Sequence, residues 1–568
     1  MKQKILLVAI NAKYIHSNPA VYSLYAYAKE WQDEIEIVEY TINQQESAIL
    51  ADIYQRKPRM IAFSCYIWNM HMVESLLQDL PQVLPGADIW LGGPEVSFDA
   101  PGRLEKYSCL TGIMLGEGEA TFSELVECYV KGKTSVSDLT QVAGLCLPGE
   151  KALEQPFYTA ERSLTDLNTI PFFYQEMGLE EFENRIIYYE SSRGCPFRCS
   201  YCLSSIDKAA RLRSLDLVLP ELQFFLDYKV PQVKFIDRTF NCNKEHAMAI
   251  WQYILEHDNG VTNFHFEVAA DIMTKDELAV IEKMRPGLIQ LEIGVQSTNL
   301  DTIAEIHRVM DLEKVRKNVD AVKGFHNTHQ HLDLIAGLPF EGLESFVKSF
   351  NEVYDMRPDQ LQLGFLKVLK GSYMESQAKK YDMHFHMAPP YEVLSTQWIR
   401  YDEILKLKQI EQMVELFYNS GQFTATLAML QQGFETPFAM FDAMAVFYEE
   451  NDYYVHVPAR SYRYQVIYSF AKKHMPEAIA AVGQALTYDL YLRENCKSRP
   501  AFAMDLMPWK DSIRELTIDK KDHIEVFRYP VWEKSAEKMM RELSEPAFVR
   551  FCYGQRDPLS HNARTEVL

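Results

Sequence analysis

The sequence predicts an α/β chain of three domains: an N-terminal doubly wound sheet, a central partial (β/α)6 barrel and a mostly helical C-terminal domain. Apolar runs alternate with helix-length segments over residues 1–135 and again over 186–370. Residues 371–568 instead carry apolar and aromatic side chains at helical spacing. The chain has 568 residues, of which 47% are hydrophobic, so each domain can bury its own core.

The N-terminal domain is expected to contain a parallel sheet. Five apolar runs have the length of strands: Ile5–Ile10, Ile35–Tyr40, Met60–Ser64, Asp88–Leu91 and Gly112–Leu115. Four segments have helical length and spacing: Asn18–Trp31, Gln45–Tyr54, Met70–Leu80 and Ala120–Lys131. Such alternation predicts a flavodoxin-like sheet, which binds ligands at the carboxyl ends of its strands. The loops at those ends are Asn11–Pro19, Ser64–Trp68, Gly92–Ser97 and Gly116–Glu119.

Residues 136–185 are expected to link the first two domains. Val142–Leu147 and Pro156–Thr159 have the pattern of a small β-hairpin. Leu164–Tyr174 carries proline and aromatic residues and is expected to be an extended strap.

The central domain, residues 186–370, is expected to be a barrel of six βα units. Its strands are predicted at Ile186–Ser191, Gln232–Asp237, Asn263–Val268, Leu288–Val295, His329–Ile335 and Gln360–Phe365. A barrel of this kind has its site at the carboxyl ends of the strands. Glu267, Gln296 and Asp333 are polar side chains in these apolar strands, so each needs a partner or a polar ligand. Structural salt bridges or hydrogen bonds would also explain each of them.

The C-terminal region, residues 371–568, shows no catalytic motif and no fourfold cysteine set. Helices are predicted at Tyr391–Tyr418, Gln422–Gln432, Phe438–Glu450 and Ser461–Lys473. Strands are predicted at His523–Val531 and Ala547–Tyr553. This region is therefore expected to be an accessory domain.

The first central strand leads into a C-x3-C-x2-C triplet, made of Cys195, Cys199 and Cys202. Thiolates are the usual protein ligands of iron–sulfur clusters, and three of them can hold three irons of a [4Fe–4S] cubane and leave the fourth open. A structural zinc site normally has four ligands, often as two pairs, and no second pair follows here. The alternatives are three buried thiols or a zinc loop.

The triplet, with Tyr201 directly before its last cysteine, resembles the signature of the radical S-adenosylmethionine (SAM) enzymes. The resemblance implies that the three cysteines ligate a catalytic [4Fe–4S] cluster and that Tyr201 lies at the SAM. In relatives of the oxygen-independent coproporphyrinogen oxidase type, a Glu, a Gln, an Arg and an Asp also contact SAM. Those positions are occupied here by Glu267, Gln296, Arg308 and Asp333. The ammonium of SAM suits carboxylates, and its carboxylate suits arginine.

Residues 1–135 resemble the cobalamin-binding domain, whose pattern is D-x-H-x-x-G, then S-x-L/T, then Gly-Gly. Ser64 and the pair Gly92 and Gly93 match the last two elements. The resemblance implies that the dimethylbenzimidazole tail lies along these residues. Further cobalamin contacts are expected from the strand-end loops, at Asn11, His16, Tyr66, Pro94 and Glu117. A generic flavodoxin-like nucleotide or signalling domain is the alternative.

The D-x-H-x-x-G element is absent, so the resemblance implies base-off cobalamin with no histidine on cobalt. Coordination of the cobalt by His16 would contradict this expectation, although His16 is expected to form a hydrogen bond within its own loop. The Asp237–Asn241 stretch resembles the second-strand segment of cobalamin-dependent members, and its side chains are expected to face the gap between cobalamin and SAM.

Composition limits the partners and the compartment. A net charge of −21 argues against a broad nucleic-acid-binding surface. No apolar run reaches about 18 residues, so no membrane span is expected, and no early segment resembles a signal peptide. The ten cysteines include seven scattered ones, and the cytoplasm, which suits thiolate ligands, is the expected location.

Together these resemblances imply a cobalamin-dependent radical SAM enzyme that methylates an unactivated carbon through a 5′-deoxyadenosyl radical. The substrate is expected to be a small molecule or a peptide. An external reductant such as flavodoxin or ferredoxin and low-oxygen conditions are implied. Three alternatives remain open: a non-methylating rearrangement or cyclisation, modification of tRNA, and a non-enzymatic cobalamin or redox sensor.

Overall fold

The structure is a computed structural model that describes residues 4–149, 155–496, 498–519, 521–533 and 535–568. The chain divides into two compact units. The first comprises Met1–Lys283, Ile306–Val309 and Leu366–Thr396, and the second comprises Met284–Glu305, Met310–Phe365 and Gln397–Leu568. This division does not test the predicted boundaries at residues 135, 185 and 370, which stay predictions.

The first unit begins with the predicted parallel sheet. Its strands are β1 (Ile5–Asn11), β2 (Ile35–Thr41), β3 (Met60–Ser64), β4 (Asp88–Gly92) and β5 (Leu110–Met114). They lie in the order β2-β1-β3-β4-β5. This is the flavodoxin-like order, in which the chain reverses direction across the sheet between β1 and β3. Every residue of β1 is buried, as expected for a central strand covered on both faces.

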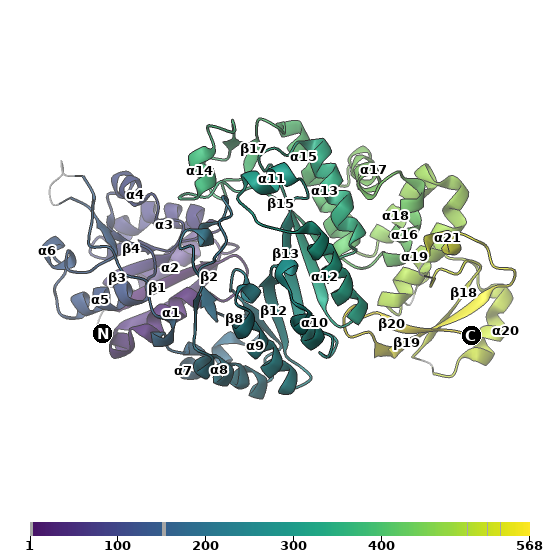
Figure 1. Cartoon of the computed structure of the whole chain (residues 1–568), viewed down its shortest axis with the longest axis horizontal. Helices are drawn as coiled ribbons and strands as arrows, with labels where there is room; N and C mark the ends of the chain where they lie inside the picture. Colours follow the sequence, from purple (N-terminus) through teal and green to yellow (C-terminus); the bar gives the residue numbers. More distant parts are fainter. Residues whose placement is uncertain (1–3, 150–154, 497, 520, 534) are drawn as a thin grey trace. The chain divides into compact units, whose positions relative to one another are not determined.

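Helices cover both faces of this sheet (Figure 1). They are α1 (Pro19–Tyr27), α2 (Glu46–Arg56), α3 (Met70–Val83), α4 (Ala100–Lys106) and α5 (Glu119–Val130). The predicted helix Asn18–Trp31 ends early, and the chain continues as a 3₁₀ turn over Lys29–Glu34. Asn18 caps α1 by accepting a hydrogen bond from Ala20, and Pro19 occupies the first helical position.

The linker adds a hairpin to the edge of the same sheet. After the short helix α6 (Val136–Leu139), β6 (Leu145–Leu147) pairs antiparallel with both β5 and β7 (Phe157–Tyr158). The strap then runs to α7 (Phe173–Met177).

The first half of the barrel also lies in the first unit. Its strands β8 (Ile187–Tyr189), β11 (Gln232–Phe235) and β12 (Asn263–Val268) are parallel, in that order. The intervening helices are α8 (Leu215–Asp227), α9 (Lys244–Glu256) and α10 (Lys275–Ile281). Two short strands, β9 (Ser192–Arg193) and β10 (Arg211–Leu212), pair antiparallel and close the base of the cysteine loop.

Residues 366–396 complete the first unit. They form α14 (Tyr373–Gln377), β16 (His384–Phe385) and β17 (Val393–Ser395). The predicted helix Tyr391–Tyr418 is therefore wrong over its first ten residues. Val393 N–H donates to Leu366 O at 2.8 Å, and this pairing with a neighbouring backbone segment overrides the local helical pattern.

The second unit holds the other predicted barrel strands and the C-terminal region. Strands β13 (Ile289–Gln296), β14 (His329–Ala336) and β15 (Gln360–Phe365) are parallel, in that order. Their helices are α11 (Leu300–Glu305), α12 (Leu312–Phe325) and α13 (Leu343–Asp355). Burial alternates along β13 and β14, so only one face of these strands is fully covered.

The C-terminal region is mostly helical, as predicted. It contains α15 (Tyr401–Met413), a π-helical turn (Val414–Asn419), α16 (Thr424–Leu430), α17 (Pro437–Glu450), α18 (Arg463–His474), α19 (Ile479–Arg493), α20 (Lys510–Leu516) and α21 (Ala536–Met539). An antiparallel sheet follows, made of β18 (His523–Phe527), β19 (Ala547–Arg556) and β20 (Ala563–Val567).

The π-helical turn meets the edge strand β15. Leu361 N–H donates to Asn419 Oδ1 at 2.9 Å, and Asn419 Nδ2 donates to Leu361 O at 2.9 Å. One side-chain amide therefore satisfies both backbone groups of Leu361 in the way a neighbouring strand would.

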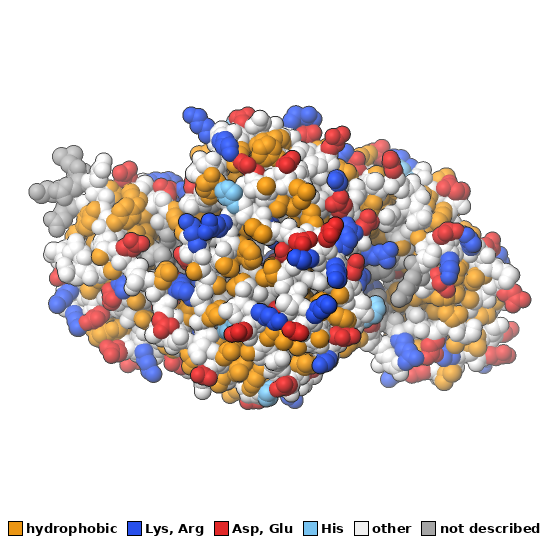
Figure 2. All heavy atoms as spheres, in the orientation of Figure 1, with side chains coloured by type: hydrophobic (Ala, Val, Ile, Leu, Met, Phe, Trp, Pro, Cys, Tyr) orange, Lys and Arg blue, Asp and Glu red, His pale blue; other side chains and the backbone are white. Residues whose placement is uncertain are grey.

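Among the described residues, no helix combines the length and apolar character needed to cross a bilayer. On the face drawn in Figure 2, basic and acidic side chains are interspersed. The single-sign basic surface that nucleic-acid binding favours does not appear among the described residues on that face.

Candidate functional site

The three cysteines of the triplet lie on the loop that β9 and β10 close. All three are free thiols; Cys195 and Cys199 are buried and Cys202 is half-buried. The loop is fixed by hydrogen bonds to its backbone. Ser205 Oγ donates to the carbonyl of Cys202 at 2.6 Å and lies 3.0 Å from the carbonyl of Cys199, and Ser200 N–H donates to Ile306 O.

The spacing of the sulfur atoms tests which group this loop fits. Among the described residues, only Glu292, His331 and Asp333 form a group whose ligand atoms all lie within 4.8 Å of one another. The cysteine triplet is not such a group, so at least two of its three sulfurs lie more than 4.8 Å apart. Zinc–sulfur bonds of about 2.3 Å in a tetrahedron bring sulfurs to within about 4 Å. The donor set, three free thiols on one loop, suits a [4Fe–4S] cluster with three cysteine ligands.

Two of the three sulfurs contact polar side chains from neighbouring elements. Cys195 Sγ lies 3.6 Å from Thr239 Oγ1, and Arg308 Nη1 donates to Cys199 Sγ at 3.6 Å. Burial raises the pKa of the Cys199 thiol, and the Arg308 guanidinium opposes this shift. Positive charge at this position favours the thiolate that an iron cluster needs.

The segment after β11 lies beneath the cysteine loop. Asp237 is fully buried and accepts hydrogen bonds from Ser191 N–H (2.9 Å), Ser191 Oγ (2.7 Å) and Ser192 Oγ (2.5 Å). Phe240 and Asn241 are also buried. The expectation that this segment faces a gap between two cofactors is therefore wrong for these three residues. Arg238 is the exposed member, with 56% of its side chain accessible.

We expect Asp237 to make stability depend on pH. Burial raises its pKa to about 7, against the hydrogen bonds from Ser192 and Ser191, whereas the unfolded value is about 3.9. Between these values the folded chain binds more protons than the unfolded chain, so stability falls as pH rises. Thermal midpoints at about pH 5 and about pH 8 should fall more for the wild type than for Asp237→Asn.

The matched control is Asp276→Asn on α10, because that carboxylate is exposed and pairs with Lys244 at 2.7 Å. It should leave the pH trend of the wild type in place. An equal fall in the midpoints of wild type and Asp237→Asn would contradict the assignment.

Three adjoining cavities separate the cysteine loop from the carboxyl edge of the N-terminal sheet. Their volumes are about 360, 910 and 460 Å³. Tyr66 and Arg193 line all three. Tyr201 and Cys202 line the second cavity, which therefore reaches the triplet.

Each residue predicted to contact cobalamin lines at least one of these cavities. The first cavity is lined by Ser64, Tyr66, Gly92, Gly93, Pro94 and Glu117. The third is lined by Asn11 and His16. The side chain of Asn11 donates to Glu39 Oε1 at 2.8 Å, and Ser64 Oγ accepts from Asn18 at 3.3 Å.

His16 has its ring partner outside its own loop. Its Nδ1 lies 2.6 Å from Tyr188 Oη, on β8. Burial lowers the pKa of His16, and Lys13 and Lys234 lower it further. The ring is therefore neutral at pH 7 and is already hydrogen-bonded. Its partner is Tyr188 and not, as was expected, a residue of its own loop.

Glu117 fastens the strap that closes the first two cavities. Its carboxylate accepts from Thr165 N–H at 2.7 Å and pairs with Arg211. Burial acts to raise the pKa of Glu117, but Arg211, Thr165 and Arg193 together hold it below its usual range. Glu117 is thus ionised at pH 7, and its negative charge strengthens the hydrogen bond from Thr165 and the ion pair with Arg211 that hold the strap.

Gly93 is confined by the backbone of the neighbouring loop. Its φ is +109°, and a Cβ atom there would lie 2.6 Å from Cys65 O. A side chain would therefore displace the backbone of the neighbouring loop before it reached a bound heterocycle. Gly93→Leu would change the loop itself and is not a clean probe of the cavity.

Sequence reasoning missed Arg193, which lies two residues before the first cysteine. It pairs with Glu190 at 2.8 Å and with Glu119 at 2.7 Å. These carboxylates raise its pKa above the usual value, although burial acts in the other direction. The only signal in the sequence was a basic residue beside the triplet, which is common in loops.

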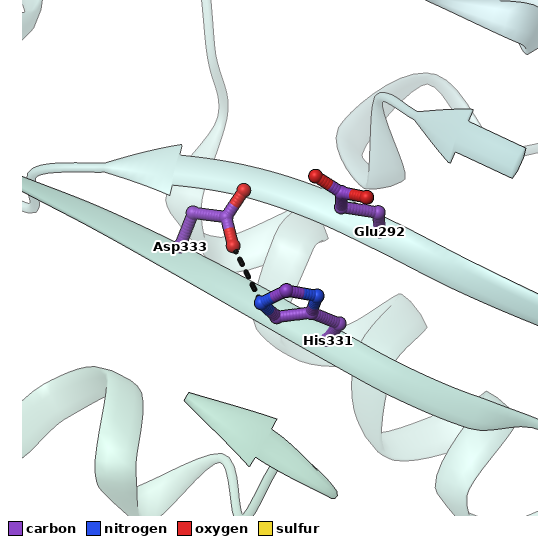
Figure 3. Close-up of side chains that lie close together, drawn as sticks. All are labelled: Glu292, His331 and Asp333. Atoms are coloured by element: carbon purple, nitrogen blue, oxygen red, sulfur yellow. Dashed lines mark ion pairs between the residues drawn. The ribbon is translucent and has the colours of Figure 1, made fainter. Parts of the chain in front are cut away.

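The residues predicted to contact SAM fall in both units. Glu267 and Arg308 lie in the first unit, and Gln296 and Asp333 lie in the second. Gln296 has φ +70° at a β-bulge where the register of β13 against β14 shifts. In Figure 3, Asp333 and His331 project from β14 and Glu292 from the neighbouring β13. His331 Nε2 lies 3.0 Å from Asp333 Oδ1.

We expect truncation of each SAM contact to cost about 1.5–3 kcal/mol of binding, because each is charged or polar and partly desolvated. The variants are Glu267→Ala, Gln296→Ala, Arg308→Ala and Asp333→Ala, measured by calorimetry on the reconstituted protein. Glu245→Ala, an exposed carboxylate on α9, is the control. Unchanged affinity in any one variant removes that residue from the site.

Family comparisons agree with the two halves of this site. Residues 5–126 match the B12 binding domain, and residues 189–353 match the Radical SAM superfamily. The chain combines a B12-binding domain with a radical SAM domain. The predicted family and fold class are confirmed. Residues 379–550 of this cobalamin-binding radical SAM protein match a third family, described as a protein of unknown function (DUF4080).

Relatives of this cobalamin-binding radical SAM protein include methyltransferases and a cyclase. An uncharacterized methyltransferase of Pyrococcus horikoshii is 24% identical, over 56% of this chain and 67% of that protein. A 2-(S-pantetheinyl)-carbapenam-3-carboxylate methyltransferase of Streptantibioticus cattleyicolor is 26% identical, over 53% of this chain and 46% of that protein. An anaerobic magnesium-protoporphyrin IX monomethyl ester cyclase of Rubrivivax gelatinosus is 22% identical, over 59% of this chain and 61% of that protein. The chain thus spans about half to two thirds of these curated relatives.

Solved structures share the fold. The cobalamin-dependent SAM radical enzyme OxsB superimposes with a TM-score of 0.58 at 14% identity, over 86% of this chain and 83% of that chain. The radical SAM methyltransferase TsrM from Kitasatospora setae superimposes with a TM-score of 0.53 at 14% identity, over 68% of this chain and 79% of that chain. Identities this low establish the fold alone.

Proposed function

We propose that this protein is a cobalamin-dependent radical SAM enzyme that methylates an unactivated carbon, with a [4Fe–4S] cluster, SAM and cobalamin as its cofactors. One observation carries the proposal. The second cavity is lined on one side by the strand-end loops of the B12-binding half, at Tyr66 and Pro94, and on the other by Tyr201 and Cys202. A molecule in this cavity can contact both halves.

When bound, the three cofactors supply reductive SAM cleavage, hydrogen abstraction and methyl transfer. The chain's own residues bind and orient them. Cys195, Cys199 and Cys202 would hold the cluster, and Arg308 would stabilise thiolate charge beside it. Glu117 and the strap would close the first cavity and exclude water from the cobalamin tail.

The second cavity favours a substrate with a large apolar body. Five exposed apolar side chains line it: Trp68, Phe98, Tyr158, Leu164 and Ile206. Three charged groups of its wall are already paired within the protein, namely Glu117, Arg162 and Lys370. The most exposed cation of its wall is Arg238, whose nearest carboxylate, Glu267, is 3.7 Å away. An amphiphilic small molecule or peptide meets these conditions.

The remaining partners and the location belong to the same proposal. An external reductant such as flavodoxin or ferredoxin would supply the electron, and no nucleic acid is involved. An open-iron cluster is oxidation-sensitive, which supports a cytoplasmic, low-oxygen setting.

Comparative mass spectrometry of a deletion strain tests the function, with amphiphilic extracts analysed first. We expect a precursor to accumulate and a product heavier by one CH₂ group to disappear. Cyclisation is the second candidate, favoured by the cyclase among the relatives, and its product would not carry the added mass of one CH₂ group. A change confined to RNA would contradict both.

Cobalamin ligation is tested by electron paramagnetic resonance of the cob(II)alamin form. His16 is neutral and already bonded to Tyr188, so we expect base-off cobalamin without an axial nitrogen. A nitrogen superhyperfine splitting that disappears in His16→Ala would identify His16 as the ligand. The same splitting retained in that variant would implicate a different base.

A further inference from the structure

The segment Asp237–Asn241 connects the cysteine loop to the end of β12. Asp237 binds Ser191 and Ser192, where the chain leaves β8 toward the triplet. At the other end, Asn241 Nδ2 donates to Ala269 O at 3.0 Å, and Ala269 N–H donates to Asn241 Oδ1 at 2.9 Å. The backbone between them is therefore held at both ends against the two neighbouring strands.

Thr239 lies in the middle of this fixed segment. Its Oγ1 is 3.6 Å from Cys195 Sγ and 2.7 Å from Arg238 O. A hydroxyl has one proton, so it can donate to only one of these atoms at a time. A neutral Cys195 thiol can itself donate to Oγ1, which leaves the hydroxyl proton on the Arg238 carbonyl.

A cluster-bound Cys195 changes this balance, because a thiolate has no proton to donate. The hydroxyl can then turn to the sulfur, where it makes a charge-assisted bond that is stronger than a neutral one. Hydrogen bonds to cluster sulfurs raise the reduction potential, since they stabilise the more negative reduced state.

We propose that Thr239 is a positioning residue that raises the reduction potential of the cluster through a hydrogen bond to Cys195, with Asp237 and Asn241 fixing it in place. This inference rests on the proposed function, in which the triplet holds a [4Fe–4S] cluster. Together with Arg308 on Cys199, Thr239 gives two of the three ligand sulfurs a side-chain donor among the described residues.

The test compares Thr239→Val with Thr239→Ser in anaerobically reconstituted full-length protein. Valine keeps the shape and removes the hydroxyl, whereas serine keeps the hydroxyl. We expect equal iron content in all three proteins, a more negative midpoint potential in Thr239→Val, and the wild-type potential in Thr239→Ser. The potential is followed by electron paramagnetic resonance of the reduced cluster. Equal potentials in wild type and Thr239→Val would overturn the inference.

The remaining outcomes are also decisive. Loss of iron in either variant would overturn the inference, because the substitution would then have changed the binding of the cluster and not its potential alone. Ser204→Ala, in the same loop, should leave the potential unchanged, and a shift equal to that of Thr239→Val would overturn the specific role of Cys195. Absence of iron from the wild type would instead refute the proposed function itself.

Discussion

Anaerobically reconstituted wild-type protein should hold about four irons and four sulfides, and the triple variant of Cys195, Cys199 and Cys202 to Ala should hold none. These are free thiols on one loop, as the three-cysteine ligation of such a cluster requires. Without the cluster there is no electron source for SAM, so 5′-deoxyadenosine production should fall to background. Iron and sulfide analysis and chromatography of the products under dithionite measure both.

The matched control is Cys242→Ala, which removes a free thiol just after β11 and outside the triplet. It should keep the cluster and SAM cleavage. Loss of the cluster in this variant would make Cys242 a fourth ligand. Production of 5′-deoxyadenosine by the triple variant would refute the radical SAM assignment of this loop.

The second large effect is expected in the first cavity. Ala20 lies on α1 and lines this cavity, which measures about 360 Å³. A tryptophan at this position would occupy space that the cobalamin tail needs, so Ala20→Trp should bind cobalamin at least about tenfold more weakly, or about 1.4 kcal/mol. Its iron content should not change, because Cys195, Cys199 and Cys202 do not line the first cavity. Absorbance of the cofactor and iron analysis are measured on the same sample.

Ala51→Trp is the control for this change. Ala51 is exposed on α2 and lines none of the three cavities. It should bind cobalamin like the wild type. Full cobalamin binding by Ala20→Trp would place the tail outside the first cavity.

The strands were predictable because their signals are local. β3, β12 and β15 have the predicted bounds, since β3 is an apolar run and β12 and β15 alternate polar with apolar residues. Helix α4 (Ala100–Lys106) was not predicted, because Pro101 and Gly102 lie in its first turn and its burial depends on tertiary packing. The start of α15 was placed too early, because the pairing of Val393 with Leu366 involves a distant segment.

The candidate site also has features that the local sequence predicts and features that depend on the fold. The three cysteines of the triplet lie within eight consecutive residues, so their spacing alone predicts that they ligate an iron–sulfur cluster. The role of Asp237 could not be predicted, because its partner Ser191 lies 46 positions earlier and is an ordinary serine in sequence. The bond between His16 and Tyr188 spans 172 positions for the same reason. Local motifs identify the cofactors, whereas the groups that hold them in place depend on the fold.

The amide of Asn419 on the backbone of Leu361 has a consequence for how the chain stays in solution. An uncovered edge strand can recruit a strand from another molecule and start ordered aggregation. In β15 the peptide groups of Leu361 already have a partner in the π-helical turn, and Tyr418 Oη donates to the carbonyl of nearby Pro358. A chain cut after residue 378 would lose both contacts. We therefore expect the C-terminal region to hinder the pairing of β15 with a strand of another molecule.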